Sequence, residues 1–462
     1  MSRLFLPDLL YAENAVHEGA GLLVGSDGAV LCVTTPQNAP EAELIRLPGK
    51  ALLPGLANAH SHTFQRLFRA RAEGRLSGGD TFWTWREQMY RAAAFVTPED
   101  LYDIARATFL EMLAAGITVV GEFHYLHNDR DGRPYADPNT LAHQVIRAAQ
   151  SVGIRICLLR TAYLRAGFQR EPHPGQRRFY ESPDDYLRNV DALLADLAGN
   201  SKVSIGAAPH SIRAVPLAVL RDIAAFAHER ELPLHMHISE QPAENQACLA
   251  EYGHTPISLV HAHGILDRRS TLVHAIHLTD SEFQQVASSG STICSCPTTE
   301  RNLGDGIFPA DLAARLRIPV AFGTDSQAQI DILEDARQSE YHLRLAQRER
   351  GILDQIDDQD IATRLLRSAT NSGYRALGLS GGSLAPGEPA DFFTADLNDL
   401  ALLGADQRSL PAQAVFALSR AAIRDVAVAG EVIIRDNQHP HAEDIRTRYR
   451  QVQQRFQNQE TQ

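Results

Sequence analysis

The order of apolar and polar residues predicts an alternation of short strands and amphipathic helices through the middle of the chain. The predicted strands cover residues 53–62, 117–124, 154–160, 203–210, 232–240, 271–277, 291–297 and 319–325. The predicted helices include residues 97–115, 139–152, 184–198, 216–230 and 358–377. Eight strands that alternate with helices favour a (β/α)8 TIM barrel of the α/β class over an open doubly wound sheet. No glycine-rich phosphate turn follows the first strand, which also argues against a dinucleotide-binding fold.

The two ends of the chain have a different pattern, with short β-rich segments separated by turns. We expect residues 1–53 and 380–437 to form the two halves of one small β-sandwich domain. The barrel then occupies residues 54–379. Residues 438–462 form a charged tail that is expected to be helical.

Length and composition fit a large globular protein, since 44% of the 462 residues are hydrophobic and 22% are charged. No apolar run approaches the roughly 20 residues that span a bilayer, and the N-terminus lacks the apolar region of a secretory signal. The five cysteines are odd in number and irregularly spaced, which argues against a disulfide framework. We therefore expect a cytoplasmic protein with reduced cysteines.

The charge balance limits the partners of this protein. Its formal net charge is −12, and no basic patch is apparent along the chain. Nucleic acid and anionic membrane are therefore not expected as partners. We expect a small-molecule substrate, which would need local positive groups if it were anionic, and a homodimer.

Histidines and a carboxylate follow several of the predicted strands. His60 and His62 are two residues apart, so both side chains point the same way from the end of the first strand. His237 ends the fifth strand, His274 lies on the sixth and Asp325 ends the eighth. Since the C-terminal ends of barrel strands meet at one mouth, these residues predict a metal site that suits zinc.

The residues around these positions resemble the amidohydrolase superfamily, in its mononuclear deaminase branch. The likeness covers nearly the whole chain and includes Ala59-His-Ser-His62, His237-x-x-Glu240, Val273-His-Ala275, the segment that starts at Cys296-Pro-Thr-Thr-Glu, and Gly323-Thr-Asp-Ser326. The resemblance implies one zinc ion per chain, held by His60, His62, His237 and Asp325, with Glu240, His274 and Asp325 as catalytic residues. Two-metal barrels of this kind carry a lysine at the mouth of strand four, whereas Lys202 lies at its start. One metal is therefore expected.

Three further segments resemble the members of this branch that act on N-formimino-L-glutamate in histidine degradation. They are Phe82-Trp-Thr-Trp-Arg86-Glu, Gly121-Glu-Phe-His-Tyr125 and Asn302-Leu-Gly-Asp-Gly-Ile-Phe-Pro309. The resemblance implies that the substrate is bound by Gln65, Arg86, Tyr125, His210 and Arg213. The sequence departs from the pattern after strand eight, where Asp325-Ser-Gln327 stands in place of Asp-Ser-His.

The implied reaction is a hydrolytic deimination. Zinc activates a water molecule to attack the formimino carbon. Glu240 accepts the water proton and passes it to the departing nitrogen, while His274 polarises the developing tetrahedral centre. Asp325 binds zinc and accepts a hydrogen bond from the attacking water. The products are N-formyl-L-glutamate and ammonia. A guanidinium is the natural partner of each substrate carboxylate, which fits Arg86 and Arg213.

Three alternatives remain open from the sequence. The same zinc site could deaminate a purine or another cyclic amidine, for which aromatic stacking and amide hydrogen bonds would matter more than two arginines. It could also remove a leaving group other than nitrogen. A catalytically inactive structural relative is a different class, but such proteins typically lose metal ligands, and here all four are present.

Overall fold

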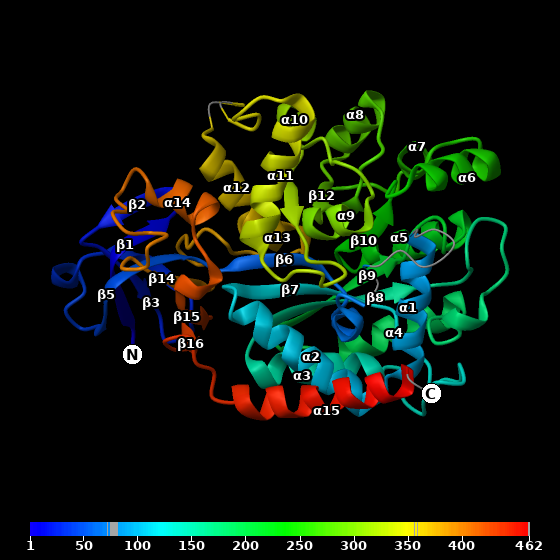
Figure 1. Ribbon diagram of the computed structural model, residues 1–462, viewed down its shortest axis with the longest axis horizontal. Helices are drawn as coiled ribbons and strands as arrows, with labels where there is room; N and C mark the ends of the chain where they lie inside the picture. The colour runs from blue at the N-terminus through cyan, green and yellow to red at the C-terminus, as the bar shows by residue number, and fades with distance from the viewer. Residues whose placement is uncertain (72, 74–81, 355, 358, 461–462) are drawn as a thin grey trace.

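The computed structural model describes residues 1–71, 73, 82–354, 356–357 and 359–460. Two sheets organise them, and Figure 1 shows the sheet of the chain ends on one side of a larger barrel. The barrel strands are all parallel and follow the chain order from β6 to β13. Their bounds are β6 Leu56–Ser61, β7 Ile117–His124, β8 Arg155–Ala162, β9 Val203–Pro209, β10 Leu234–Ile238, β11 Ser270–His274, β12 Thr292–Ser295 and β13 Val320–Phe322. The predicted (β/α)8 barrel is confirmed.

The barrel closes between its first and last strands, although β13 is only three residues long. The backbone N–H of Asp325 donates to the carbonyl of His60 at 3.0 Å, and the N–H of His62 donates to the carbonyl of Asp325 at 3.1 Å. Asn58 Nδ2 donates to the hydroxyl of Thr324 at 2.7 Å, and Asn58 Oδ1 accepts from the backbone N–H of Thr324 at 3.0 Å. Closure therefore brings the ends of the first and eighth strands into direct contact.

Helices surround the barrel, and several begin with the caps that the sequence indicates. Thr97 and Asp100 form a reciprocal capping box at the start of the second long helix, which satisfies two otherwise unpaired N–H groups. The helix bounds are α1 Phe82–Phe95, α2 Pro98–Leu113, α3 Thr140–Val152, α4 Pro183–Asp196, α5 Leu217–Glu229, α6 Pro242–Tyr252, α7 Pro256–Ala262, α8 Asp280–Ser289, α9 Pro297–Leu303, α10 Ala310–Arg315, α11 Ile332–Gln347, α12 Ile361–Ala369, α13 Asn371–Ala376, α14 Leu410–Phe416 and α15 Ala442–Glu460. Short 3-10 helices are η1 Pro36–Asn38, η2 Thr63–Phe68, η3 Pro174–Gln176 and η4 Arg420–Ala422.

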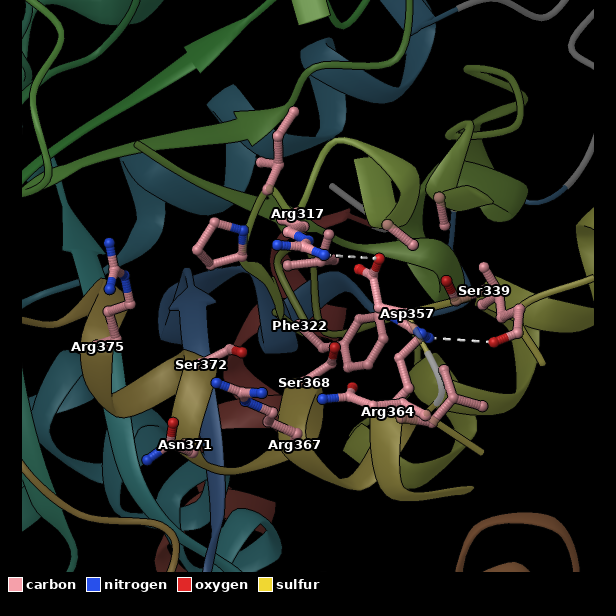
Figure 2. Close-up of a pocket in the computed structure, with 18 residues that line it drawn as sticks. Arg317, Phe322, Ser339, Asp357, Arg364, Arg367, Ser368, Asn371, Ser372 and Arg375 are labelled. Carbon is pink, nitrogen blue, oxygen red and sulfur yellow. Dashed lines mark hydrogen bonds and ion pairs between the residues drawn. The ribbon is translucent and has the colours of Figure 1, made fainter. Parts of the chain in front are cut away.

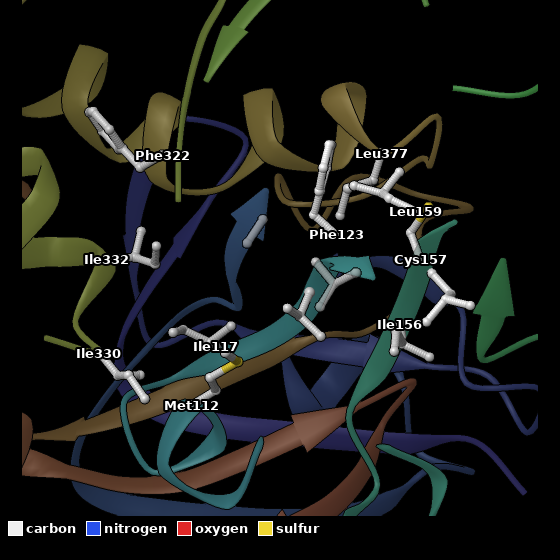
Figure 3. Close-up of a cluster of buried hydrophobic side chains, with 14 of the residues drawn as sticks. Met112, Ile117, Phe123, Ile156, Cys157, Leu159, Phe322, Ile330, Ile332 and Leu377 are labelled. Atoms are coloured by element: carbon white, nitrogen blue, oxygen red, sulfur yellow. The ribbon is translucent and has the colours of Figure 1, made fainter. Parts of the chain in front are cut away.

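One predicted helix is wrong in its continuity. The helix expected over residues 358–377 is two helices, α12 and α13, because the backbone turns at Thr370 (φ −126°, ψ −94°). The turn sends α13 across the N-terminal end of the barrel, where the carbonyl of Ala376 lies 2.7 Å from His235 Nε2. Figure 3 shows Leu377, which follows α13, beside Phe123 and Leu159 of the barrel strands. This end of the barrel is therefore filled by protein, and its opposite end carries the site.

The chain ends build the second sheet together. Its strands are β1 Arg3–Ala12, β2 Ala15–Glu18, β3 Gly21–Val24, β4 Val30–Thr34, β5 Glu43–Pro54, β14 Phe392–Asp396, β15 Ile423–Val428 and β16 Glu431–Ile434. β1 pairs with β5 in parallel, while the remaining pairs in this sheet are antiparallel. The sheet has its own apolar core, in which the rings of Phe5 and Phe392 meet edge to face. Only Gly55 separates β5 from β6, so this sheet leads directly into the strand that carries His60.

The C-terminal helix α15 lies along α2 on the outside of the barrel (Figure 1). Val452 and Phe456 are buried there, and Phe456 packs edge to face against Phe95. Tyr449 donates a hydrogen bond of 3.0 Å to the carbonyl of Arg66 in η2.

All five cysteines are free thiols. Among the helices that the structure describes, none combines the length and the apolar character needed to cross a membrane.

Candidate active site

The four residues expected to bind a metal meet at the C-terminal end of the barrel. Ligand atoms of His60, His62, His237 and Asp325 all lie within 4.8 Å of one another, and the four residues are buried. His60 Nε2 and His62 Nε2 are 3.2 Å apart, and they lie 3.4 Å and 3.2 Å from Asp325 Oδ1. Ligands about 2.0–2.1 Å from a tetrahedral zinc ion are separated by roughly 3.3–3.4 Å. The spacing of these atoms fits that geometry.

Hydrogen bonds to carbonyl groups orient two of the three imidazoles. His62 Nδ1 lies 2.9 Å from the carbonyl oxygen of Phe123, and His237 Nδ1 lies 3.1 Å from that of His210. Because a carbonyl oxygen can only accept, each Nδ1 carries the proton and each Nε2 presents its lone pair. Both rings therefore have the tautomer that a metal ion requires.

The ionisation states also suit a cation. Burial lowers the pKa of His60 to about 3 and that of His237 well below its ordinary value, so both rings are neutral at physiological pH. Burial alone would raise the pKa of Asp325, but the close approach of the His60 and His62 side chains holds it well below its usual range. Three imidazole nitrogens and one carboxylate are a ligand set typical of zinc.

Glu240 and His274 lie beside this ligand set. His274 Nε2 is 3.8 Å from Glu240 Oε1 and 3.8 Å from Asp325 Oδ2, while its Nδ1 is 3.3 Å from Glu300 Oε1. Burial would lower the pKa of His274, but Glu240, Glu300 and Asp325 together hold it well above its ordinary value. His274 is therefore a cation that directs one N–H toward the metal ligands.

The strand ends that carry these residues adopt an uncommon backbone conformation. Ser239, His274 and Asp325 have φ values of +51°, +71° and +44°, in the left-handed region that residues other than glycine rarely enter. Such conformations cost of order 1–3 kcal/mol each and persist at functional sites when the surroundings enforce them. Ser239 follows β10, His274 is the last residue of β11, and Asp325 follows β13, so all three lie where the chain turns at the mouth of the barrel.

One cavity of about 50 Å³ is lined by three of the four metal-site residues, His62, His237 and Asp325, and by all five residues expected to bind substrate. Gln65 Nε2 donates to the hydroxyl of Tyr125 at 2.8 Å, while Gln65 Oε1 is buried without a partner among the described residues. The guanidinium of Arg86 on α1 lies 5.6 Å from the ring centre of Tyr90. The cavity lining comprises His62, Gln65, Trp85, Arg86, Met89, Tyr125, Tyr163, Phe179, His210, Arg213, His237, Glu240, His274, Leu303 and Asp325.

The cavity is lined by charged groups of both signs, among them Arg86, Arg213, Glu240 and Asp325. Burial would lower the pKa of Arg213, but Glu244 and Glu240 hold it above its ordinary value. The same burial raises the pKa of Glu244 to about 7, against the opposing effect of Arg213. Burial lowers the pKa of His210 well below its ordinary value, and the cation of Arg213 lowers it further, so His210 is neutral. Arg213 therefore presents a persistent positive charge beside Glu240 and Glu244.

A larger cavity of about 470 Å³ lies away from this chemistry (Figure 2). It is at the N-terminal end of β13, next to α12 and α13, and Arg317, Arg364, Arg367 and Arg375 contribute to its wall. Arg317 pairs there with Asp357 at 3.4 Å, and Arg364 donates to the carbonyl of Leu353 at 3.1 Å. None of the metal-type clusters among the described residues falls in this cavity. Its size alone does not make it the active site.

Several residues of the site were not assigned from the sequence. Glu122 accepts hydrogen bonds from Ser61 Oγ and from the backbone and hydroxyl of Thr63, each at 2.7 Å, and so fixes the residues on both sides of His62. Glu300 orients His274 as described above. Glu122 and Glu300 lie in segments that carry the family resemblance, and this was the only feature of the sequence that pointed to them. No feature of the sequence pointed to Met89, Tyr163, Phe179 and Leu303, which form the apolar part of the cavity wall.

Comparison with known proteins gives concordant results. A model of the amidohydrolase family matches residues 51–433. The chain is 40% identical over 442 residues to formimidoylglutamate deiminase of Pseudomonas aeruginosa, covering 95% of this chain and 94% of that protein. It is 28% identical over 419 residues to 8-oxoguanine deaminase of the same species, covering 87% and 88%. A crystal structure of an amidohydrolase from Brucella melitensis superposes with a TM-score of 0.91 at 31% identity, covering 98% of this chain and 99% of that one.

Proposed function

The chain belongs to the amidohydrolase family and is a hydrolase that acts on carbon–nitrogen bonds, and we propose that it converts N-formimino-L-glutamate and water into N-formyl-L-glutamate and ammonia. The observation that carries this proposal is the composition of one cavity. It unites a metal ligand set, a carboxylate beside that set and two arginines, Arg86 and Arg213. The substrate has a formimino group at one position and two carboxylates at others, which matches these three features.

The metal proposed for the site is a single zinc ion held by His60, His62, His237 and Asp325. Their separations and the tautomers of His62 and His237 support this choice. When bound, zinc would act as a Lewis acid, which lowers the pKa of a water molecule and so makes it nucleophilic near neutral pH.

The protein's own residues manage the protons of the reaction. Glu240 lies next to the ligand set, where it can take a proton from the attacking water and deliver it to the departing nitrogen. His274 is charged and directs Nε2–H at the same place, so it stabilises negative charge as the formimino carbon becomes tetrahedral. Asp325 stays ionised and accepts a hydrogen bond from the water. The nitrogen leaves as ammonia, and the carbon keeps the oxygen of water.

Recognition of the substrate is assigned to other residues that line the cavity. Arg86 and Arg213 each provide a planar guanidinium, the donor group best matched to a carboxylate. Tyr125 and neutral His210 add hydrogen bonds, and Gln65 orients the formimino group beside the metal ligands. The overall negative charge of the protein gives no long-range attraction for an anion, so these close contacts must supply the affinity.

A second candidate is deamination of a purine, which 8-oxoguanine deaminase of Pseudomonas aeruginosa represents by its name. The aromatic side chains of Trp85, Tyr125 and Phe179 in the cavity wall favour this candidate, since flat bases stack on such rings. The cation of Arg213, half-buried beside two carboxylates, favours the anionic substrate instead. We therefore retain formiminoglutamate as the first assignment.

The proposal extends to the biological setting. An enzyme with this activity acts in histidine degradation, and we propose that it does so in the cytoplasm, as a homodimer, without nucleic acid or membrane as a partner. Sedimentation of the purified protein measures its oligomeric state.

The test is product analysis with the zinc-loaded protein in water enriched in oxygen-18. We expect one equivalent of ammonia for each N-formylglutamate formed, and one heavy oxygen in the formyl group. Formiminoglutamate recovered unchanged, together with ammonia release from 8-oxoguanine, would replace the first candidate with the second.

A further inference from the structure

Gln327 lies two residues after Asp325, at the seam where the barrel closes. It is fully buried and holds a left-handed backbone conformation (φ +62°). It neither lines the catalytic cavity nor belongs to the set of residues around the metal site. A buried amide in such a conformation is costly unless all its hydrogen bonds are satisfied.

One end of the Gln327 amide is tied to the strand that carries the first two histidines. Gln327 Nε2 donates to Ser61 Oγ at 2.8 Å, and Ser61 Oγ in turn donates to Glu122 Oε2 at 2.7 Å. Ser61 separates His60 from His62. Gln327 therefore holds the residue between two metal ligands.

The oxygen of the Gln327 amide bonds to Thr324, in the segment that follows β13. Thr324 Oγ1 donates to Gln327 Oε1 at 2.9 Å and accepts from Asn58 Nδ2 at 2.7 Å. The directions of these bonds are fixed at both ends, because the backbone N–H of Thr324 must donate to Asn58 Oδ1 and the backbone carbonyl of Asp325 can only accept from Gln327 Nε2. The side chain at position 327 must therefore donate and accept at the same time.

Backbone contacts complete the arrangement. Gln327 Nε2 also donates to the carbonyl of Asp325 at 3.1 Å, and Arg66 Nη1 donates to the carbonyl of Gln327 at 2.6 Å. Arg66 is itself held by Glu111 on α2 through contacts of 2.6–3.0 Å. The carbonyl of Asp325, the side chain of Ser61 and the outer helices are thus joined through one residue.

We propose that Gln327 is a positioning residue, which locks the first and last barrel strands in register so that Asp325 and the His60–His62 pair keep the spacing that a metal ion needs. The proposal rests on the metal site of the proposed function but on no particular substrate. Its test is therefore made on metal retention, which stays informative if the substrate assignment fails.

The main experiment compares zinc release from wild type and Gln327→Met into a chelator, well below the unfolding temperature of either protein. Methionine has a similar length but makes none of the three side-chain hydrogen bonds. Partners that orient metal ligands typically contribute about 10–100-fold in metal affinity, so we expect release at least about tenfold faster. The cobalt-substituted variant should also have an altered visible spectrum, since the ligand geometry relaxes.

The matched control is Asn139→Leu, which removes another buried amide whose bonds to Arg160 and to the carbonyl of Asn189 lie on a different wall of the barrel. It should lower the unfolding temperature and leave zinc release within about twofold of wild type. Equal acceleration by Asn139→Leu and Gln327→Met would show that general loosening causes release, and would overturn the proposal.

Ser61→Ala provides a second variant that removes only a hydroxyl group, should Gln327→Met not fold. We expect it to accelerate zinc release about tenfold by itself. Where both fold, the double variant should release zinc no more than about threefold faster than the faster single variant, because both changes break one connection. Wild-type release from Ser61→Ala, or multiplication of the two single effects, would contradict the proposal.

Discussion

Replacement of Arg213 by methionine tests how the substrate is recognised. Arg213 is partly buried, and its charge is retained there because Glu240 and Glu244 face it. Methionine keeps much of the apolar stem and removes the guanidinium. Loss of a charge-assisted partner typically costs about 1.5–3 kcal/mol, which corresponds to roughly 10–150-fold in kcat/KM. The remaining carboxylates then face the substrate carboxylate directly, so we expect a loss near the upper end of this range.

The assay compares three formimino substrates on wild type and Arg213→Met. These are formiminoglutamate, the N-formimino derivative of 4-aminobutyrate, which lacks the α-carboxylate, and that of 2-aminobutyrate, which lacks the side-chain carboxylate. The variant should lose activity on formiminoglutamate and on only one analogue, since the other never made the deleted contact. Zinc content should remain full, because Arg213 is not a ligand.

The control for this experiment is Arg188→Met, which removes an exposed arginine of α4 that pairs with Asp185. Surface pairs of this kind contribute little, so all three substrates should be processed as by wild type. Equal kcat/KM of Arg213→Met and wild type on formiminoglutamate would refute the role of Arg213. An equal loss on all three substrates would show damage to the site rather than loss of recognition.

Three further predictions concern the chemistry. Glu240→Gln should keep its zinc and its fold but lose at least about 10²-fold in kcat, the usual scale for a general acid–base group, and near-normal turnover would exclude that role. Metal analysis of fully active protein should find one ion per chain, and two tightly held ions would contradict the proposal of a single zinc ion. Burial raises the pKa of Glu244 from the ordinary 4.5 to about 7 in the folded protein. Between pH 4.5 and pH 7 the folded protein therefore holds a proton on Glu244 that the unfolded chain has released. The unfolding free energy should therefore fall as pH rises from 4.5 to 7, and Glu244→Gln should flatten that slope in urea titrations; an unchanged slope would refute the shift.

Much of the fold could be predicted from the sequence, because strand and helix periods differ and eight strands alternate with helices. The four metal-site residues could also be located, since each follows or ends an apolar strand and parallel strands present their C-terminal ends together. The helix expected over residues 358–377 failed because apolar periodicity continues through Thr370, while the break there depends on packing against the end of the barrel.

The supporting residues of the site could not be assigned in this way. The roles of Glu122 and Glu300 depend on neighbours 61 and 26 residues away along the chain, which no local pattern specifies. The left-handed turns at Ser239, His274 and Asp325 likewise depend on the closed barrel around them. Position 327 stood out only as a departure from a family pattern, and its hydrogen bonds across the seam supply the physical role.

The central claim is tested most directly by the ratio of kcat/KM for formiminoglutamate to that for 8-oxoguanine, measured by ammonia release from the same zinc-loaded preparation. Two guanidinium contacts that only the dianionic substrate can make predict a preference for formiminoglutamate of at least about 10²-fold. A ratio below one would contradict the account and assign this zinc site to purine deamination.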